Sequence, residues 1–92
     1  MRKTEQLKNY MEDLVEEVLR DYLNKRNDVC KCNRCMLDMK AFTLNKLPPH
    51  YIVSDRGHLH WKLDEMRTQF TVDVLAVVIE AVEKINNNKR HE

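Results

Sequence analysis

The sequence predicts an all-α fold: a small single domain of three main helices with a cysteine-rich helix junction and a Pro-Pro corner. The chain has 92 residues, which suits one domain rather than two. It contains one glycine and two prolines, whereas a β-sandwich or barrel needs a turn residue about every 8–12 positions. The scarcity of glycine also excludes the glycine-rich loops that bind phosphate groups in nucleotide-dependent enzymes.

The first helix is expected over residues 4–25, where apolar residues recur every three or four positions. Acidic residues cover the opposite face, which we interpret as solvated. Arg20, Lys25 and Arg26 lie near the end of the segment, where cations suit the negative pole of the helix dipole. The apolar stripe consists of Leu7, Tyr10, Met11, Leu14, Val15, Val18, Leu19, Tyr22 and Leu23.

The second helix is expected over residues 33–46. It should end at Leu47, because Pro48 disfavours helical geometry in the residue that precedes it, and Pro49 does the same to Pro48. The apolar line of this helix is shorter than that of the first, and it consists of Leu37, Ala41 and Leu44.

The third helix is expected over residues 63–85, after an irregular connection at residues 50–60. Its apolar residues cover more than half of the circumference, so one core face cannot account for all of them. A second copy of the chain is the simplest cover for the other side, which predicts a homodimer through this helix with Val78 in the interface. The domain core should span about residues 5–85, followed by a disordered tail over residues 86–92.

Composition and charge exclude several functions. Charged residues make up 34% of the chain, the mean hydropathy is −0.67, and the longest apolar run, Val74–Ile79, is far too short to span a membrane. The net charge of +1 leaves no basic stripe for direct DNA binding. Met1 leads into charged sequence without the pattern of a signal peptide, so we expect a cytoplasmic protein. We recognise no catalytic arrangement and predict a non-enzymatic role.

Three cysteines within six residues are the most informative feature of the sequence. Cys30, Cys32 and Cys35 form a C-x-C-x-x-C run at the junction of the first two helices. Structural disulfides are rare in the cytoplasm, whereas clustered thiolates are good ligands for zinc. The run therefore predicts a structural zinc site. Three reduced thiols without a metal are the simplest alternative, and a redox dithiol is a weaker one, because no βαβ context surrounds the cysteines.

Tetrahedral zinc takes four ligands, so the cysteine run is one donor short. His50, His58 and His60 follow on the connection and are the candidates within the chain, and another subunit is the remaining source. Surface histidines are the simpler explanation for the His58 and His60 pair.

A second group of candidate site residues lies around the Pro-Pro corner. Asp38 and Asn45 are seven residues apart and share a helix face, while Lys46 and Tyr51 flank the two prolines. Such residues could bind a ligand that carries phosphates and aromatic bases, because lysine pairs with phosphate and tyrosine stacks on a base. Solvated or capping side chains are the simpler explanation.

The same stretch resembles the signature of the late competence development protein ComFB family. The shared pattern is D-x-x-A-x-x-L-N-x-L-P-P-x-Y, running here from Asp38 to Tyr51, and the resemblance covers roughly residues 5–85. It implies a small all-α domain that forms a homodimer. Members with the C-x-C-x-x-C run are similar in carrying a zinc site.

The resemblance also implies a function in natural competence or second-messenger signalling. Cyanobacterial members lack the cysteines and act as receptors for cyclic di-GMP and cyclic di-AMP, which suggests Asp38, Asn45, Lys46 and Tyr51 as ligand-binding residues. Since this sequence has the cysteine run, our leading hypothesis is a zinc-stabilised homodimeric regulator. A cyclic dinucleotide receptor is the alternative, and a thiol redox protein is a third, weaker hypothesis.

Overall fold

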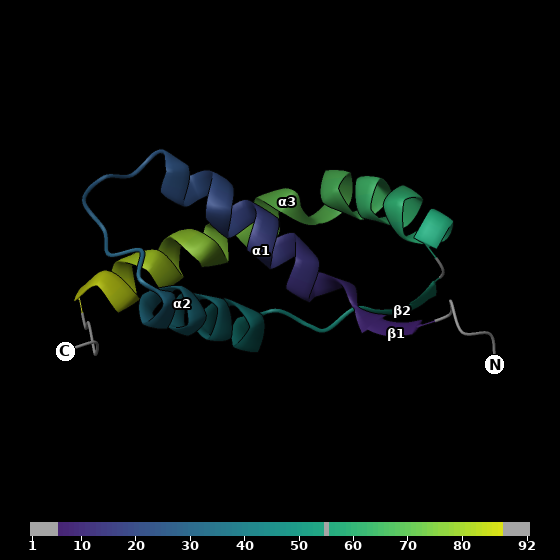
Figure 1. The fold of residues 1–92 in the computed structure, drawn as a ribbon, viewed down its shortest axis with the longest axis horizontal. Helices are drawn as coiled ribbons and strands as arrows, with labels where there is room; N and C mark the ends of the chain where they lie inside the picture. The colour runs from purple at the N-terminus through teal and green to yellow at the C-terminus, as the bar shows by residue number, and fades with distance from the viewer. Residues whose placement is uncertain (1–5, 55, 88–92) are drawn as a thin grey trace.

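The fold is mostly helical, with three helices and a small two-stranded sheet (Figure 1). The computed structural model describes residues 6–54 and 56–87, with the side chains of residues 7–53, 65 and 67–87. The three predicted helices are confirmed, but the sheet corrects the all-α prediction. The elements in chain order are β1 (Gln6–Asn9), α1 (Tyr10–Asn24), α2 (Asn33–Lys46), β2 (Tyr51–Ser54) and α3 (Arg56–Asn87).

The first helix begins at Tyr10, six residues later than the apolar stripe predicts. Asn9 is its N-cap: the backbone is extended there, and the side-chain Oδ1 accepts a hydrogen bond from the backbone N–H of Met11 at 3.2 Å. Glu12 and Asp13 follow in the first turn, where negative charge is favourable. The residues before Asn9 are therefore free to form a strand.

The sheet joins two segments that the sequence predicts as helix and as irregular connection. β1 and β2 are antiparallel, with Leu7 opposite Val53 and Asn9 opposite Tyr51. The backbone continues this pairing beyond the strand, since the N–H of Tyr10 donates to the carbonyl of His50 at 2.7 Å. The N-terminus of α1 is thereby fixed to the segment that follows the Pro-Pro corner.

The second helix has the predicted boundaries, residues 33 to 46. Cys32 is its N-cap, and Leu47 after its last residue has an extended backbone, with φ −110° and ψ 143°. This is the conformation that a following proline imposes, so Pro48 ends the helix as predicted.

The third helix is longer than predicted at both ends. It begins at Arg56 and continues to Asn87, so residues 86 and 87 are helical and not part of a disordered tail. Residues 88–92 of that predicted tail lie outside the described residues. The helix runs along the molecule from the sheet to the opposite end, and it contacts both α1 and α2 (Figure 1).

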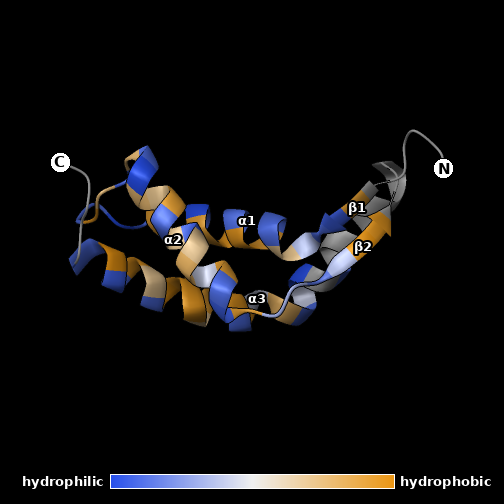
Figure 2. Cartoon of the chain, turned by 90° about the horizontal axis from the view of Figure 1, so that it is seen from below, coloured by the Kyte–Doolittle hydropathy of each residue, from blue (hydrophilic) through white to orange (hydrophobic). Residues whose placement is uncertain are grey.

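The core lies between the three helices, where α3 contributes one of its two apolar sides. Val78 is fully buried there, so its predicted place in a dimer interface is wrong: its side chain is already covered within one chain. The opposite side of α3 exposes Val72 and Ile79, at 79% and 39%. Figure 2 shows apolar residues recurring along the length of α3. No helix in the described part of the chain is long and apolar enough to cross a membrane.

Candidate metal centre

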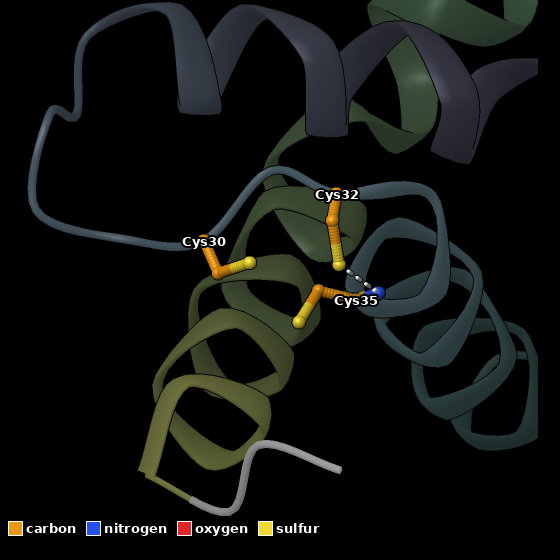
Figure 3. Close-up of side chains that lie close together, drawn as sticks. All are labelled: Cys30, Cys32 and Cys35. Atoms are coloured by element: carbon orange, nitrogen blue, oxygen red, sulfur yellow. Dashed lines mark hydrogen bonds between the residues drawn. The ribbon is translucent and has the colours of Figure 1, made fainter. Parts of the chain in front are cut away.

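The three cysteines come together where the chain passes from α1 into α2. Their Sγ atoms all lie within 4.8 Å of one another (Figure 3), and all three cysteines are reduced thiols. Cys30 is at the end of the connection, Cys32 caps α2, and Cys35 is in the first turn of that helix. We call this group, Cys30, Cys32 and Cys35, the thiol triad.

The start of α2 fixes the geometry of the triad. The backbone N–H of Cys35 donates to the Sγ of Cys32 at 3.4 Å, and the N–H of Met36 donates to the carbonyl of Cys32 at 2.9 Å. Cys32 therefore pairs the N–H of Cys35, one of the groups that a helix leaves unpaired at its N-terminus, and its carbonyl accepts the first regular hydrogen bond of the helix. The spacing C-x-x-C follows from this, because one helical turn brings Cys35 back to the side of the capping residue.

Burial and hydrogen bonding divide the thiols into two kinds. The N–H of Cys35 lowers the pKa of the Cys32 thiol, because a hydrogen bond to sulfur stabilises the thiolate. Cys35 is 1% exposed. Burial and the neighbouring thiols raise the pKa of Cys35 to about 12, because a buried thiolate loses the water that would stabilise it. A cation among the three sulfurs would stabilise the thiolate form.

The triad fits a zinc ion. Zn–S bonds of about 2.3 Å in a tetrahedral site separate the sulfurs by about 3.8 Å. The largest separation of 4.8 Å therefore needs to contract by only about 1 Å, within the reach of side-chain rotation. Sulfur ligands also select zinc over the hard cations calcium and magnesium. Cys30, Cys32 and Cys35 are the residues that would hold the ion.

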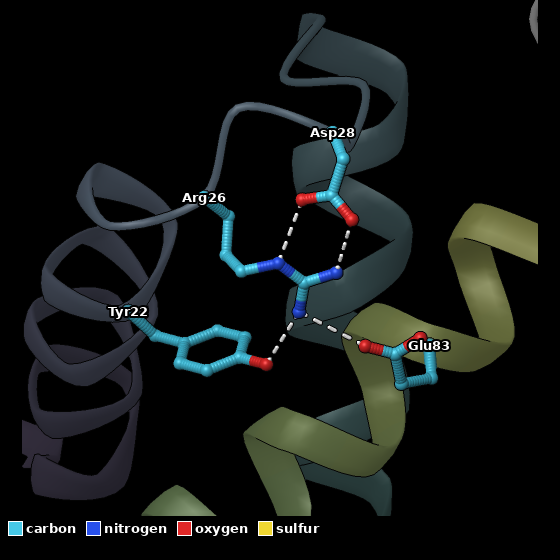
Figure 4. Close-up of polar contacts among 4 residues, drawn as sticks. All are labelled: Tyr22, Arg26, Asp28 and Glu83. Carbon is cyan, nitrogen blue, oxygen red and sulfur yellow. Dashed lines mark hydrogen bonds and ion pairs between the residues drawn. The ribbon is translucent and has the colours of Figure 1, made fainter.

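A charged network holds the connection that leads to the triad (Figure 4). Arg26 Nε and Nη2 donate to the two carboxylate oxygens of Asp28 at 2.8 and 2.7 Å. Its Nη1 donates to the hydroxyl of Tyr22 at 2.6 Å and to Oε2 of Glu83 at 3.0 Å. One guanidinium thus joins the end of α1, the connection and the last part of α3.

This role of Arg26 is not apparent in the sequence, which places Arg26 simply among the cations at the end of the first helix. The contact with Glu83 spans 57 residues, so no local pattern reveals it. The neighbouring pair is a weak local signal, because Arg26 and Asp28 are separated by one residue. Hydrogen bonds from Arg26 lower the pKa of Asp28 from its ordinary 3.8 to about 2.

The structure does not bring His50 to the triad. His50 lies at the other end of α1, where its backbone N–H donates to Oδ1 of Asn9 at 2.9 Å. Its ring lies 5.8 Å from that of Phe70, centroid to centroid. The 15 residues of α1 separate Asn9 from the cysteine connection by about 22 Å. His50 of the same chain is therefore too distant to be the fourth ligand.

The other two histidine candidates belong to the first turns of α3. The side chains of His58 and His60 lie outside the described residues. The backbone that carries them directly follows β2, at the end of the molecule opposite the triad (Figure 1). Among the described residues, no histidine, aspartate or glutamate joins the three thiols.

The four residues predicted to bind a ligand are not joined by any contact found among them. Oδ2 of Asp38 lies 3.9 Å from Nε of Arg34, and Nζ of Lys46 lies 3.1 Å from Oε2 of Glu80, with which it forms an ion pair. Asn45 is exposed on α2, whereas Tyr51 is 60% exposed on β2. Two hollows in the described part of the chain, of about 240 and 230 Å³, are lined by other residues. Cyclic dinucleotide binding stays a prediction, to be tested by calorimetric titration.

Fold and triad together define a class: a small, mostly helical domain with a three-cysteine candidate metal centre. A family model described as late competence development protein ComFB matches residues 8–89. The chain therefore belongs to the ComFB family, as the motif around the Pro-Pro corner suggests. Competence protein ComFB of Bacillus subtilis is a relative with 24% identity over 82 residues, which are 89% of this chain and 84% of that protein.

A solved structure has the same fold. It is that of the late competence protein ComFB from Bacillus subtilis, with a TM-score of 0.77 and 24% sequence identity. The alignment covers 92% of this chain and 96% of that one. The likeness in fold therefore extends over nearly all of both chains.

Proposed function

We propose that this chain is a non-enzymatic regulator linked to natural competence, whose fold is stabilised by a zinc ion at the thiol triad. Membership of the ComFB family supports the link to competence. The single observation that carries the zinc proposal is the meeting of three sulfurs within 4.8 Å at the start of a helix. We place the protein in the cytoplasm, where reducing conditions keep thiols available as ligands.

A bound zinc ion would connect the cysteine connection to α2 and neutralise two of the three thiolate charges. Lys31 and Arg34 are exposed beside the cysteines in the sequence, and their positive charge offsets the remaining one. The energy of metal binding adds to folding stability, because the unfolded chain has no preformed site. Such a contribution matters in a domain of 92 residues, whose core is small.

A structural role suits the triad better than a redox role. A reactive cysteine needs a thiolate that solvent and substrate can reach. Cys35 is buried and its thiol pKa is raised, so it would be a poor partner in thiol–disulfide exchange. Both properties suit a ligand that becomes a thiolate only when a metal displaces its proton.

Metal analysis of protein purified without a metal-affinity tag tests the zinc proposal. We expect about one zinc per chain in the wild type and a large loss in Cys35→Ser, because three-ligand sites do not tolerate the loss of a sulfur. Tyr51→Ala is the matched control at the other end of the molecule and should retain its metal. A wild-type content below about half a zinc per chain would contradict the proposal.

We also propose that the domain is a homodimer that covers the outer side of α3. Val72 is 79% exposed there, and Ile79 lies two turns further along the same side. A hollow of about 230 Å³ between α1 and α3 lies beside them, and it is lined by Val18, Asp21, Tyr22, Lys25, Thr71 and Leu75. A two-fold symmetric pair could place the exposed residues of each copy against this surface of the other.

Light scattering coupled to size-exclusion chromatography tests the dimer. Val72→Asp should give a folded monomer, because it adds a charge to a side chain that is exposed in one chain. Val78→Asp is the contrasting variant and should unfold the protein, since Val78 is fully buried. A monomeric wild type, or a dimeric Val72→Asp, would refute this assignment.

A further inference from the structure

A hollow of about 240 Å³ lies between the last turns of α1 and the start of α2. The connection between these two helices closes its third side (Figure 1). The residues that line the hollow are Arg20, Leu23, Asn24, Lys31 and Met36. None of them is a cysteine or one of the residues that the sequence suggests for ligand binding, so the hollow is distinct from both candidate sites.

The size of the hollow limits what it can hold. Its 240 Å³ correspond to about eight water molecules at the density of the liquid. Sites for drug-sized ligands begin at roughly 300 Å³. A dinucleotide would therefore not fit, whereas an acid with a short alkyl chain would.

The side chains around the hollow are of two kinds. Arg20 and Lys31 each carry a positive charge, and the amide of Asn24 can donate or accept a hydrogen bond. Leu23 is 3% exposed and Met36 packs against the core, so these two supply apolar surface. Two cations beside an apolar wall suit a small anion that has a short apolar part.

The acidic groups nearby leave donors for such a ligand. Nε of Arg20 donates to Oε2 of Glu16 at 2.6 Å, but Nη1 and Nη2 of the same guanidinium carry further N–H donors. Asp28 lies on the same connection as Lys31, yet both of its carboxylate oxygens accept hydrogen bonds from Arg26. The two cations of the hollow are thus not fully used within the chain.

We infer that this hollow binds a small organic anion, a carboxylate or a phosphate ester. Arg20 and Lys31 would hold its charged group, and Leu23 and Met36 would contact its alkyl part. The site goes beyond the proposed function, because it would make the connection between α1 and α2 responsive to a small metabolite. It does not depend on the zinc proposal, since no cysteine lines the hollow.

Titration of the wild-type chain with two probes, followed by NMR of the backbone amides, tests the inference. Butyl phosphate and pentanoate carry similar alkyl parts and different charged groups. Binding of either should shift the signals of residues 20–24, 31 and 36 to saturation, with a dissociation constant of about 1 mM. The probe that binds more tightly identifies the charged group.

Two further probes separate the contributions of charge and apolar surface. Butanol has the alkyl part without the charge, and inorganic phosphate has the charge without the alkyl part. Each should bind at least about tenfold more weakly than butyl phosphate or pentanoate, because each loses one of the two kinds of contact.

Variants of the cations test the site itself. Lys31→Met should weaken binding of the tighter probe about tenfold, because it removes a charged donor. Arg34→Met is the matched control: it removes the same charge beside the same cysteines, but Arg34 does not line the hollow, so the affinity should not change. Arg20→Met gives a second test that leaves the cysteine run intact, and thermal unfolding checks that each variant is folded.

Three results would each overturn the inference. They are the absence of saturable shifts at the lining residues, shifts spread over exposed lysines throughout the chain, and equal affinities in Lys31→Met and Arg34→Met. Binding of butanol as tight as that of the anions would also overturn it, because the cations would then contribute nothing. Zinc content is measured on the same wild-type samples, so a failure of the zinc proposal is distinguishable from a failure of the anion site.

Discussion

The two ends of the molecule are held together by different kinds of contact. At the end that carries the thiol triad, side chains make most of these contacts: Arg26 joins three segments, and the three sulfurs come together where the connection enters α2. At the end that carries the sheet, backbone hydrogen bonds make most of these contacts, through the pairing of β1 with β2 and of Tyr10 with His50. Binding or removal of the metal should therefore change the stability of the end that carries the triad and leave the sheet end unchanged.

The sheet end also differs in what it exposes. Leu7, Tyr51 and Val53 are largely exposed on β1 and β2. Backbone pairing fixes these residues without burying their side chains. Substitutions of those side chains should consequently have small effects on stability, whereas a residue that maintains the backbone pairing should have a large one.

Asn9 should show the largest effect on stability among these contacts. It caps α1 and also accepts the N–H of His50, so Asn9→Ala removes two hydrogen bonds at once. We expect a loss of about 2 kcal/mol in the free energy of unfolding, measured with urea. Asn9→Asp keeps the acceptor oxygen and should retain most of the stability. A loss of zinc affinity in Asn9→Ala would show that the two ends are coupled.

Arg26 should show a smaller effect, at the opposite end. Arg26→Met removes the ion pairs with Asp28 and Glu83 and the hydrogen bond to Tyr22, at a partly exposed position. We expect a loss of stability smaller than that of Asn9→Ala, because exposed ion pairs contribute little individually. Arg26→Lys keeps the charge but not the two parallel hydrogen bonds to Asp28, so it should restore only part of the stability. If Arg26→Met were as stable as the wild type, the network would make no contribution to the stability of the fold.

The smallest effect should be the pH dependence of the same network. The pKa of Asp28 falls from 3.8 to about 2 on folding, so its contribution to stability is complete above the higher value. It should be lost as the pH falls from about 3.8 to about 2. Urea unfolding of metal-free wild type and Asp28→Asn should therefore differ at neutral pH and converge in this acid range. A difference that persists at the acid end would contradict the assigned cause.

Helix positions and the cysteine site were largely predictable from the sequence, because each depends on a local pattern. The apolar spacing marks α1 and α3, Pro48 ends α2, and the C-x-C-x-x-C run marks the triad. The strands were not predictable, because a strand of four residues is too short to show a clear alternation of apolar and polar side chains. Leu7 also continues the helical spacing of α1, which hides the start of that helix at Tyr10.

The features that could not be predicted from the sequence depend on contacts between segments that are distant in the chain. The wide apolar band of α3 contains both core residues and exposed residues, and only packing against α1 and α2 decides that Val78 belongs to the core. His50 is close in sequence to the cysteine-bearing helix but lies at the far end of α1. The partners of Arg26 and of Asn9 include residues 57 and 41 positions away.

Hydrogen exchange with and without a zinc chelator tests the central claim most directly. The claim is that a metal at the thiol triad stabilises one end of the molecule. The account predicts that chelation increases exchange in residues 25–36 and in the last turns of α3, while the first turn of α1 and the sheet keep their protection. Equal exchange with and without the chelator would contradict the claim, as would a loss of protection that is uniform along the chain.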